Sequence, residues 1–348
     1  MFHLQWHITE RCNLCCTHCY KEEKLIKEEI STSQVFEILG KYYDQLDAWN
    51  FDKSNNKISL TGGEPFIRED IWDILENCYQ HREKITYGFL SNGTLITEEV
   101  ASKLKDLHVA YVQVSLEGLQ EINDQIRGRG SFEKAIRGLK FLIKNNISTS
   151  ISTTVTTKNL NEVPKLINLT KELGVSGIGI RRLVPIGMGK KMENLMITPQ
   201  QTRELFQYVL GKKGCSVGCE EGLFAQELLY IPKGICNAGY FSFSVLPNAD
   251  VYPCRRLPIL SGNLLKDNFE DILKNSKPLR ELRNLNNINK KCQSCPYFNE
   301  CFGGAKCIAN AYFKDPFAPD PQCWRLFKEL PSQEEKFEKD NKKETRIF

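Results

Sequence analysis

The chain has 348 residues, of which 41% are hydrophobic, and its 47 basic and 43 acidic residues give a net charge of +4. This composition is ordinary for a globular protein and excludes a disordered chain. No basic stripe with interleaved aromatic residues is present, so the sequence predicts no nucleic-acid partner. No apolar run approaches the ~18 residues of a membrane span, and the first residues do not form a signal peptide. We therefore expect a cytoplasmic protein that does not bind a membrane.

Segments typical of strands and of helices alternate along the first two-thirds of the chain. We predict strands at 2–9, 57–60, 85–93, 109–118, 148–157 and 175–185. We predict helices from a cap at Ser31 or Thr32, from about Glu69, and at 97–107, 131–145, 160–173 and 198–211. Six strand–helix steps indicate an α/β fold with a parallel sheet, a partial (β/α)6 barrel. Chemistry in such folds gathers at the carboxyl ends of the strands.

The 14 cysteines are unevenly distributed, since four lie within 12–19, Cys78 stands alone, and nine lie between 215 and 323. In a reducing compartment such a number more often binds metal than forms disulfides. We expect a partial-barrel domain at 1–210, a bridging segment at 211–235, a small loop-rich domain at 236–323 that needs metal or disulfide staples, and a charged tail at 324–348. Cys78 shares an apolar helix face and is expected to be a small buried hydrophobe.

Cys12, Cys16 and Cys19 have the spacing C-x3-C-x2-C on one short loop. A structural zinc ion needs four ligands, which leaves open a zinc knuckle completed by Cys15 or His18. Three thiolates also suit a cubane iron–sulfur cluster with one iron left for a small molecule. In this second interpretation Cys15 is incidental.

The stretches "RCNLCCTHCY" and "GGEP" together resemble the radical S-adenosylmethionine (SAM) superfamily. The resemblance implies that Cys12, Cys16 and Cys19 bind a 4Fe–4S cluster whose free iron chelates SAM. It also implies a SAM pocket in which the glycines of "GGEP" allow close backbone approach and the glutamate accepts from the SAM ammonium. The implied pocket residues are Tyr20, Gly62, Gly63, Glu64, Asn92, Ser115 and Arg127.

The cysteines of the last hundred residues resemble a SPASM domain, the auxiliary-cluster module of such enzymes. The resemblance implies one auxiliary cluster held by Cys292, Cys295, Cys301 and Cys323. It implies a second held by Cys236, Cys254 and Cys307. The chain departs from the family pattern with Ala249 where glycine is usual and with Ala305 where a cysteine is expected. Cys215 or Cys219 would then supply the fourth ligand, or an open iron would bind substrate; a zinc ribbon is the alternative.

The resemblance implies an enzyme that cleaves SAM reductively to a 5′-deoxyadenosyl radical and abstracts hydrogen from a ribosomally made peptide or protein. The modification would be a thioether, a carbon–carbon crosslink, an epimerised centre or an oxidation. A tetrapyrrole side-chain enzyme acting on haem precursors is the first alternative, and a non-catalytic zinc-binding interaction module is the second. Expected partners are an electron donor such as flavodoxin or ferredoxin and, because only eleven residues precede Cys12, a separate leader-peptide-binding protein.

Overall fold

The computed structural model describes residues 2–21, 28–50, 56–210, 212, 236, 238–240 and 242–334, and the backbone of 215–217. Ten strands of this part form one sheet in the order β10-β9-β8-β1-β2-β3-β4-β5-β6-β7. The strands are β1 (Phe2–Thr9), β2 (Asn56–Gly62), β3 (Thr86–Ser91), β4 (Tyr111–Ser115), β5 (Ser148–Val155), β6 (Gly177–Arg182), β7 (Cys215–Val217), β8 (Ser242–Val245), β9 (Asp250–Tyr252) and β10 (Gly262–Asn263). All neighbouring pairs from β1 to β7 are parallel, which confirms the predicted parallel α/β sheet.

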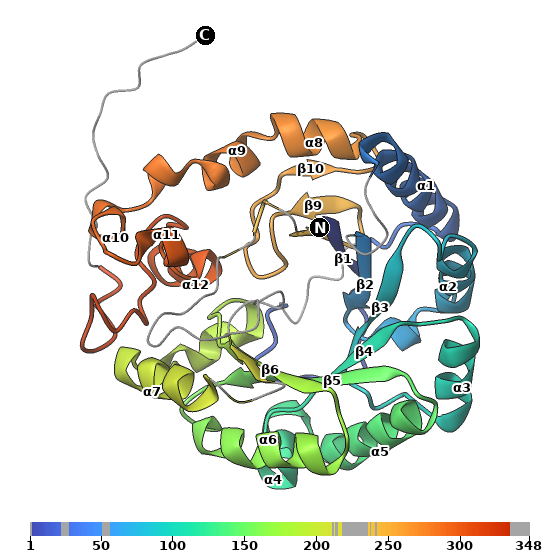
Figure 1. Cartoon of the computed structure of the whole chain (residues 1–348), viewed down its shortest axis with the longest axis horizontal. Helices are drawn as coiled ribbons and strands as arrows, with labels where there is room; N and C mark the ends of the chain where they lie inside the picture. Colours follow the sequence, from blue (N-terminus) through green and yellow to red (C-terminus); the bar gives the residue numbers. More distant parts are fainter. Residues whose placement is uncertain are drawn as a thin grey trace.

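The helices lie outside the curved sheet, and the strands form the inner wall (Figure 1). They are α1 (Thr32–Trp49), α2 (Ile71–Gln80), α3 (Glu98–Asp106), α4 (Gln120–Arg127), α5 (Ser131–Lys144), α6 (Val163–Glu172), α7 (Pro199–Val209), α8 (Phe269–Asn275), α9 (Lys277–Arg283), α10 (Lys290–Gln293), α11 (Phe298–Cys301) and α12 (Lys306–Phe313). Short 3-10 helices occupy Pro65–Ile67, Leu160–Glu162, Gly187–Leu195 and Leu285–Asn287. The six helices predicted in the first 211 residues are all present, whereas α4 was not predicted because its eight residues are too few for a clear period.

Local capping explains where several helices begin. Ser31 caps α1 in a capping box with Gln34, which settles the choice between Ser31 and Thr32. Thr198 caps α7 in the same way with Gln201, and a proline occupies the first turn. These side chains accept from backbone N–H groups that a helix start leaves without a partner.

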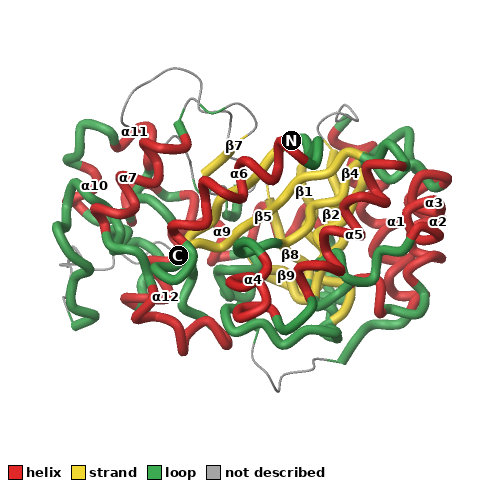
Figure 2. Tube along the Cα trace, turned by 90° about the horizontal axis from the view of Figure 1, so that it is seen from below, coloured by secondary structure: helices red, strands yellow, loops and turns green. Residues whose placement is uncertain are grey.

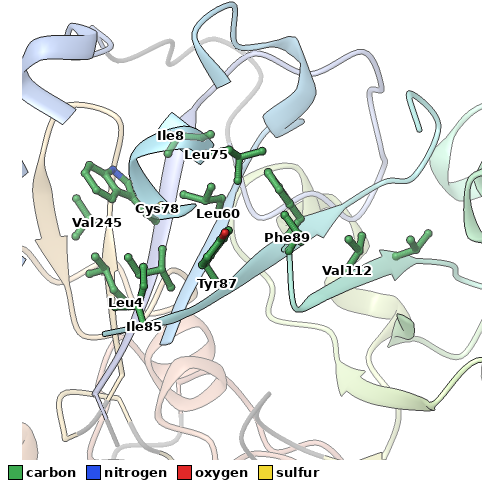
Figure 3. Close-up of a cluster of buried hydrophobic side chains, with 14 of the residues drawn as sticks. Leu4, Ile8, Leu60, Leu75, Cys78, Ile85, Tyr87, Phe89, Val112 and Val245 are labelled. Carbon is green, nitrogen blue, oxygen red and sulfur yellow. The ribbon is translucent and has the colours of Figure 1, made fainter. Parts of the chain in front are cut away.

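The apolar side chains of the strands point outward to the helices and form the main core. Leu4, Ile8, Leu60 and Phe89 are fully buried there (Figure 3). Cys78 is also fully buried in this core, as predicted, and burial raises the pKa of its thiol to about 12. The polar residues that alternate with the apolar ones in β1 are buried as well, because they face the interior of the partial barrel.

The sheet continues beyond the six predicted strands at both edges. β8 pairs in parallel with β1, and β9 and β10 then follow in antiparallel orientation. The predicted border at residue 236 is therefore not a border of the sheet, since β8 covers the edge that β1 would otherwise expose. Helices α7 and α10 to α12 gather at one end of the molecule and α1 to α3 at the other (Figure 2). Among the described residues, no helix is both long and apolar enough to cross a bilayer.

Candidate functional site

The cysteine-rich loop leaves the carboxyl end of β1 and lies directly against the glycines that end β2. Gly63 N donates to Thr9 O at 2.8 Å, and a Cβ on Gly63 would lie 1.9 Å from Arg11 O. Gly62 has a φ of 134°, and its Cβ would lie 2.2 Å from Thr9 O. Sequence reasoning assigned these glycines to close approach by a ligand. The structure shows that they also allow the backbone of the cysteine loop to pass within hydrogen-bond distance.

Two polar side chains, one directly after β3 and one at the end of α4, approach the sulfur atoms of this loop. Asn92 Nδ2 lies 3.9 Å from Cys12 Sγ, and an Arg127 guanidinium nitrogen lies 3.8 Å from Cys16 Sγ. Burial raises the pKa of the Cys16 thiol to about 11, although the Arg127 charge acts in the opposite direction. A metal ion stabilises the thiolate form, so these sulfur atoms suit metal ligation.

Glu117, two residues after the end of β4, is the electrostatic centre of the site. Its Oε1 accepts from Arg127 at 2.5 Å and lies 3.0 Å from His18 Nε2, while Oε2 accepts from Thr154 N at 2.6 Å. Burial alone would raise the pKa of Glu117, but the charges of His18 and Arg127 and these hydrogen bonds lower it to about 2. Glu117 therefore holds two side chains in place, that of His18 in the cysteine loop and that of Arg127 beside it.

Replacing Glu117 with Gln removes one charge of this buried group and leaves Arg127 without its carboxylate. We expect the free energy of unfolding to fall by about 3 kcal/mol, because an uncompensated buried charge is costly. Glu98→Gln is the matched control, since the Glu98–Lys144 pair lies at the surface and is worth less than about 1 kcal/mol. Thermal melts of the two variants measure the difference, and equal shifts would contradict the role given to Glu117.

Glu64 follows β2, and its side chain points to the neighbouring strand β3. Its side chain is fully buried, and its two oxygens accept from Ser91 Oγ and Asn92 N, each at 2.8 Å. Burial raises the pKa of Glu64 to about 7, although these hydrogen bonds act to lower it. The carboxylate therefore binds Ser91, the last residue of β3, and the backbone of Asn92, which follows it. The expected contact of Glu64 with the SAM ammonium stays a prediction.

A cavity of about 530 Å³ opens at the carboxyl ends of the strands, within the usual size range of roughly 300–1,000 Å³ for small-molecule sites. The predicted residues that line it are Cys12, Cys16, Cys19, Tyr20, Gly62, Gly63, Asn92, Ser115 and Arg127. Glu64 is the predicted SAM residue that does not line it. Tyr20 stacks edge-on against His7 and has Arg255 over its ring at 5.6 Å. The fold therefore brings nine of the ten predicted residues of this site into one cavity.

A second, smaller cavity of about 110 Å³ lies among the C-terminal cysteines. Its wall includes Cys292, Cys295, Cys301 and Cys323, the four predicted ligands of one auxiliary cluster. Burial raises the pKa of Cys292 to about 12 and that of Cys301 to about 11. The four thiols thus line one site, although their positions are spread along the chain from residue 292 to residue 323.

Cys236 and Cys307, two of the ligands predicted for a second auxiliary cluster, are buried in one apolar group with Leu183 and Val184, and Cys254, the third, packs against this group. Cys307 also lines the smaller cavity. Cys219 and the side chain of Cys215 lie outside the described residues. The backbone of Cys215 pairs with Ile178 of β6. The fourth ligand of this set, from Cys215 or Cys219 or an open iron, stays a prediction.

The family model of the radical SAM superfamily matches residues 6–170, and that of the SPASM iron–sulfur cluster-binding domain matches residues 236–296. The mycofactocin maturase MftC of Mycolicibacterium smegmatis is 33% identical over 335 residues, covering 92% of this chain and 82% of the relative. The chain belongs to the radical SAM superfamily. It is a radical SAM enzyme with a SPASM domain, and these domains bind 4Fe–4S clusters and SAM.

Other relatives of this radical SAM enzyme carry different names. An AdoMet-dependent heme synthase of Methanosarcina barkeri is 27% identical over 92% of this chain and 95% of its own. Among solved structures, anSMEcpe with bound AdoMet has a TM-score of 0.75 at 21% identity, with 95% of this chain and 96% of that one covered. Streptococcus suis SuiB bound to the precursor peptide SuiA has a TM-score of 0.71 at 19% identity, with 92% and 75% covered. These structures show the shared fold.

The donor sets fit iron–sulfur clusters better than single metal ions. Among the described residues, no three or more His, Cys, Asp or Glu side chains converge closely enough to hold one ion. Four zinc ligands would each have to lie about 2.0–2.3 Å from the same point. A cluster of several irons is larger and suits thiols that surround a cavity. The matches to the radical SAM and SPASM family models favour the iron–sulfur interpretation over the zinc knuckle and the zinc ribbon.

Sequence reasoning missed two residues of the main site. His18 was considered only as a zinc ligand, and Glu117 was passed over although it lies two residues after Ser115 in "SLEG". A carboxylate at the carboxyl end of a predicted strand was a usable signal for Glu117. Its partners could not be read from the sequence, because His18 and Arg127 are 99 and 10 residues away from it.

Proposed function

We propose that this radical SAM enzyme modifies a ribosomally made peptide or protein. The observation that carries the proposal is the 33% identity to a mycofactocin maturase along 92% of the chain, and the three cysteine groups predicted to hold clusters support it. When bound, the reduced cluster and SAM supply one-electron cleavage of SAM and hydrogen abstraction from an unactivated substrate carbon. The chain's own residues bind and orient these groups and exclude water.

In the main site we propose that Cys12, Cys16 and Cys19 hold the SAM-binding cluster. Tyr20, Gly62, Gly63, Asn92, Ser115 and Arg127 would contact SAM, since they line the same cavity. Arg127 suits a carboxylate because its planar guanidinium offers paired donors. Glu117 already takes two of its nitrogens, which leaves the nitrogen nearest Cys16 turned toward the cysteine loop.

For the C-terminal part we propose two auxiliary clusters. Cys292, Cys295, Cys301 and Cys323 would hold the first, and they surround one buried cavity. Cys236, Cys254 and Cys307 would hold the second, and their shared apolar surroundings support that set. Three thiols leave one iron of the second cluster without a cysteine from this set. We further propose flavodoxin or ferredoxin as the electron donor and a separate protein for leader-peptide binding.

The test combines SAM cleavage with peptide modification. The chain, purified anaerobically and reduced, is expected to convert SAM to 5′-deoxyadenosine and to hold about twelve irons if all three clusters are present. Co-expression with short open reading frames encoded beside its gene is expected to yield a peptide whose mass differs from the unmodified one, such as a loss of two hydrogens. Co-expression of the Cys16→Ala chain is the matched control. About eight irons would contradict the second auxiliary set.

The haem-synthase relatives, 26–27% identical over 92% or more of the chain, keep tetrapyrrole processing as the second candidate function. The same anaerobic assay with an iron porphyrin that carries propionate side chains separates the two. A decarboxylated porphyrin, with no mass change in any co-expressed peptide, would overturn the peptide proposal and leave the radical SAM assignment intact.

A further inference from the structure

Arg182, the last residue of β6, connects the barrel to the C-terminal cysteine region through a two-point ion pair. Its guanidinium nitrogens donate to Asp320 Oδ1 at 3.0 Å and to Oδ2 at 2.6 Å, and one of them also donates to Gln322 Oε1 at 3.0 Å. The side chains of Arg182 and Asp320 are 11% and 6% exposed. Such a paired geometry in a buried place is stronger and more directional than a surface salt bridge.

Asp320 also accepts hydrogen bonds from the loops that carry the cysteines. Its carboxylate accepts from Ala305 N and Gln322 N, each at 3.0 Å, and its carbonyl accepts from Cys323 N at 2.9 Å. Gln322 is fixed in turn, since its Nε2 donates to Ile197 O at 2.8 Å. One carboxylate therefore joins the end of β6, the start of α12 and the loop of Cys323.

This ion pair lies where the two cavities meet. Arg182 and Asp320 both line the small cavity of Cys292, Cys295, Cys301 and Cys323, and Arg182 also lines the main cavity. The reduction potential of an iron–sulfur cluster depends on nearby charge, hydrogen bonds and exposure to solvent.

We propose that Arg182 and Asp320 are positioning residues that seat the Cys323 loop and balance the charge beside the auxiliary cluster, and thereby set its reduction potential. Asp320 orders the loop, but its charge opposes the addition of an electron nearby. The positive charge of Arg182, which pairs with Asp320, offsets that negative charge. The inference rests on the proposed binding of a cluster by Cys292, Cys295, Cys301 and Cys323.

The test is a redox titration of the full-length, cluster-loaded chain followed by electron paramagnetic resonance. The signal of this cluster is the one that Cys295→Ala removes together with about four irons. Arg182→Gln is expected to lower the midpoint potential and Asp320→Asn to raise it. Each shift should reach about 59 mV, which is tenfold in the equilibrium constant of a one-electron couple. The double variant should return toward the wild-type value.

Two further variants separate charge from position. Arg182→Lys keeps the charge and is expected to recover most of the potential lost in Arg182→Gln. Arg325→Gln removes an exposed cation that lines the same small cavity without contacting Asp320, and solvent screening should make its shift much smaller. Shifts of the same sign in Arg182→Gln and Asp320→Asn would overturn the inference. Unchanged iron content in Cys295→Ala would instead overturn the cluster assignment on which it rests.

Discussion

Replacing Cys16 with Ala is expected to abolish the reductive cleavage of SAM. Cys12, Cys16 and Cys19 line one cavity, and Cys16 lies beside the Arg127 guanidinium. With one of the three thiolates missing, a second iron would have no cysteine ligand, and the loop would no longer hold the cluster to which SAM binds. Changes in residues that only support metal ligands already cost about 10–100-fold, so the loss of a ligand should exceed about 100-fold. Production of 5′-deoxyadenosine and the iron content measure the effect.

Cys15→Ala is the matched control, because Cys15 is the exposed neighbour of Cys16 on the same loop and is not one of the three expected ligands. This variant is expected to keep its full iron content and SAM cleavage near the wild-type rate. Retained cleavage in Cys16→Ala, or a loss in Cys15→Ala as large as that in Cys16→Ala, would refute the assignment of the three ligands.

Among substitutions that add a single methyl group, we expect Gly63→Ala to have the largest effect on thermal stability and iron content. The new Cβ would lie 1.9 Å from Arg11 O and 2.9 Å from Glu10 O, and both atoms belong to backbone that no side-chain rotation can move away. Overpacking of this kind costs about 1–3 kcal/mol or more. The cysteine loop must therefore shift away from β2, and iron should be lost from the SAM-binding cluster along with thermal stability.

Gly40→Ala is the control for Gly63→Ala. Gly40 lies inside α1, and a Cβ there would meet no atom within 4 Å. Because alanine is a better helix former than glycine, this variant is expected to be more stable by about 0.5–1 kcal/mol. Melting temperature and iron content of both variants are the measurements. A Gly63→Ala chain with wild-type melting temperature and iron content would mean that the loop does not depend on this close contact.

Most of the strand and helix pattern of the barrel could be read from the sequence because it depends on neighbours within one element. The alternation of apolar and polar residues in β1 and the capping box at Ser31 are local signals. The exceptions have a physical reason. α4 is too short to show a period, and β8 is a four-residue strand whose place beside β1 depends on tertiary pairing.

The sequence by itself determined the spacing of Cys12, Cys16 and Cys19, because three ligands within eight residues are close in any conformation of one loop. It also predicted that most of the residues expected in a SAM pocket share one cavity, since carboxyl ends of parallel strands meet at one edge of a sheet. Only the tertiary structure turned Glu64 toward β3, joined Glu117 to His18 and Arg127, and paired Arg182 with Asp320. These contacts depend on which way each side chain points across elements distant in the chain. No spacing in the sequence specifies that direction, because the packing of the whole fold decides it.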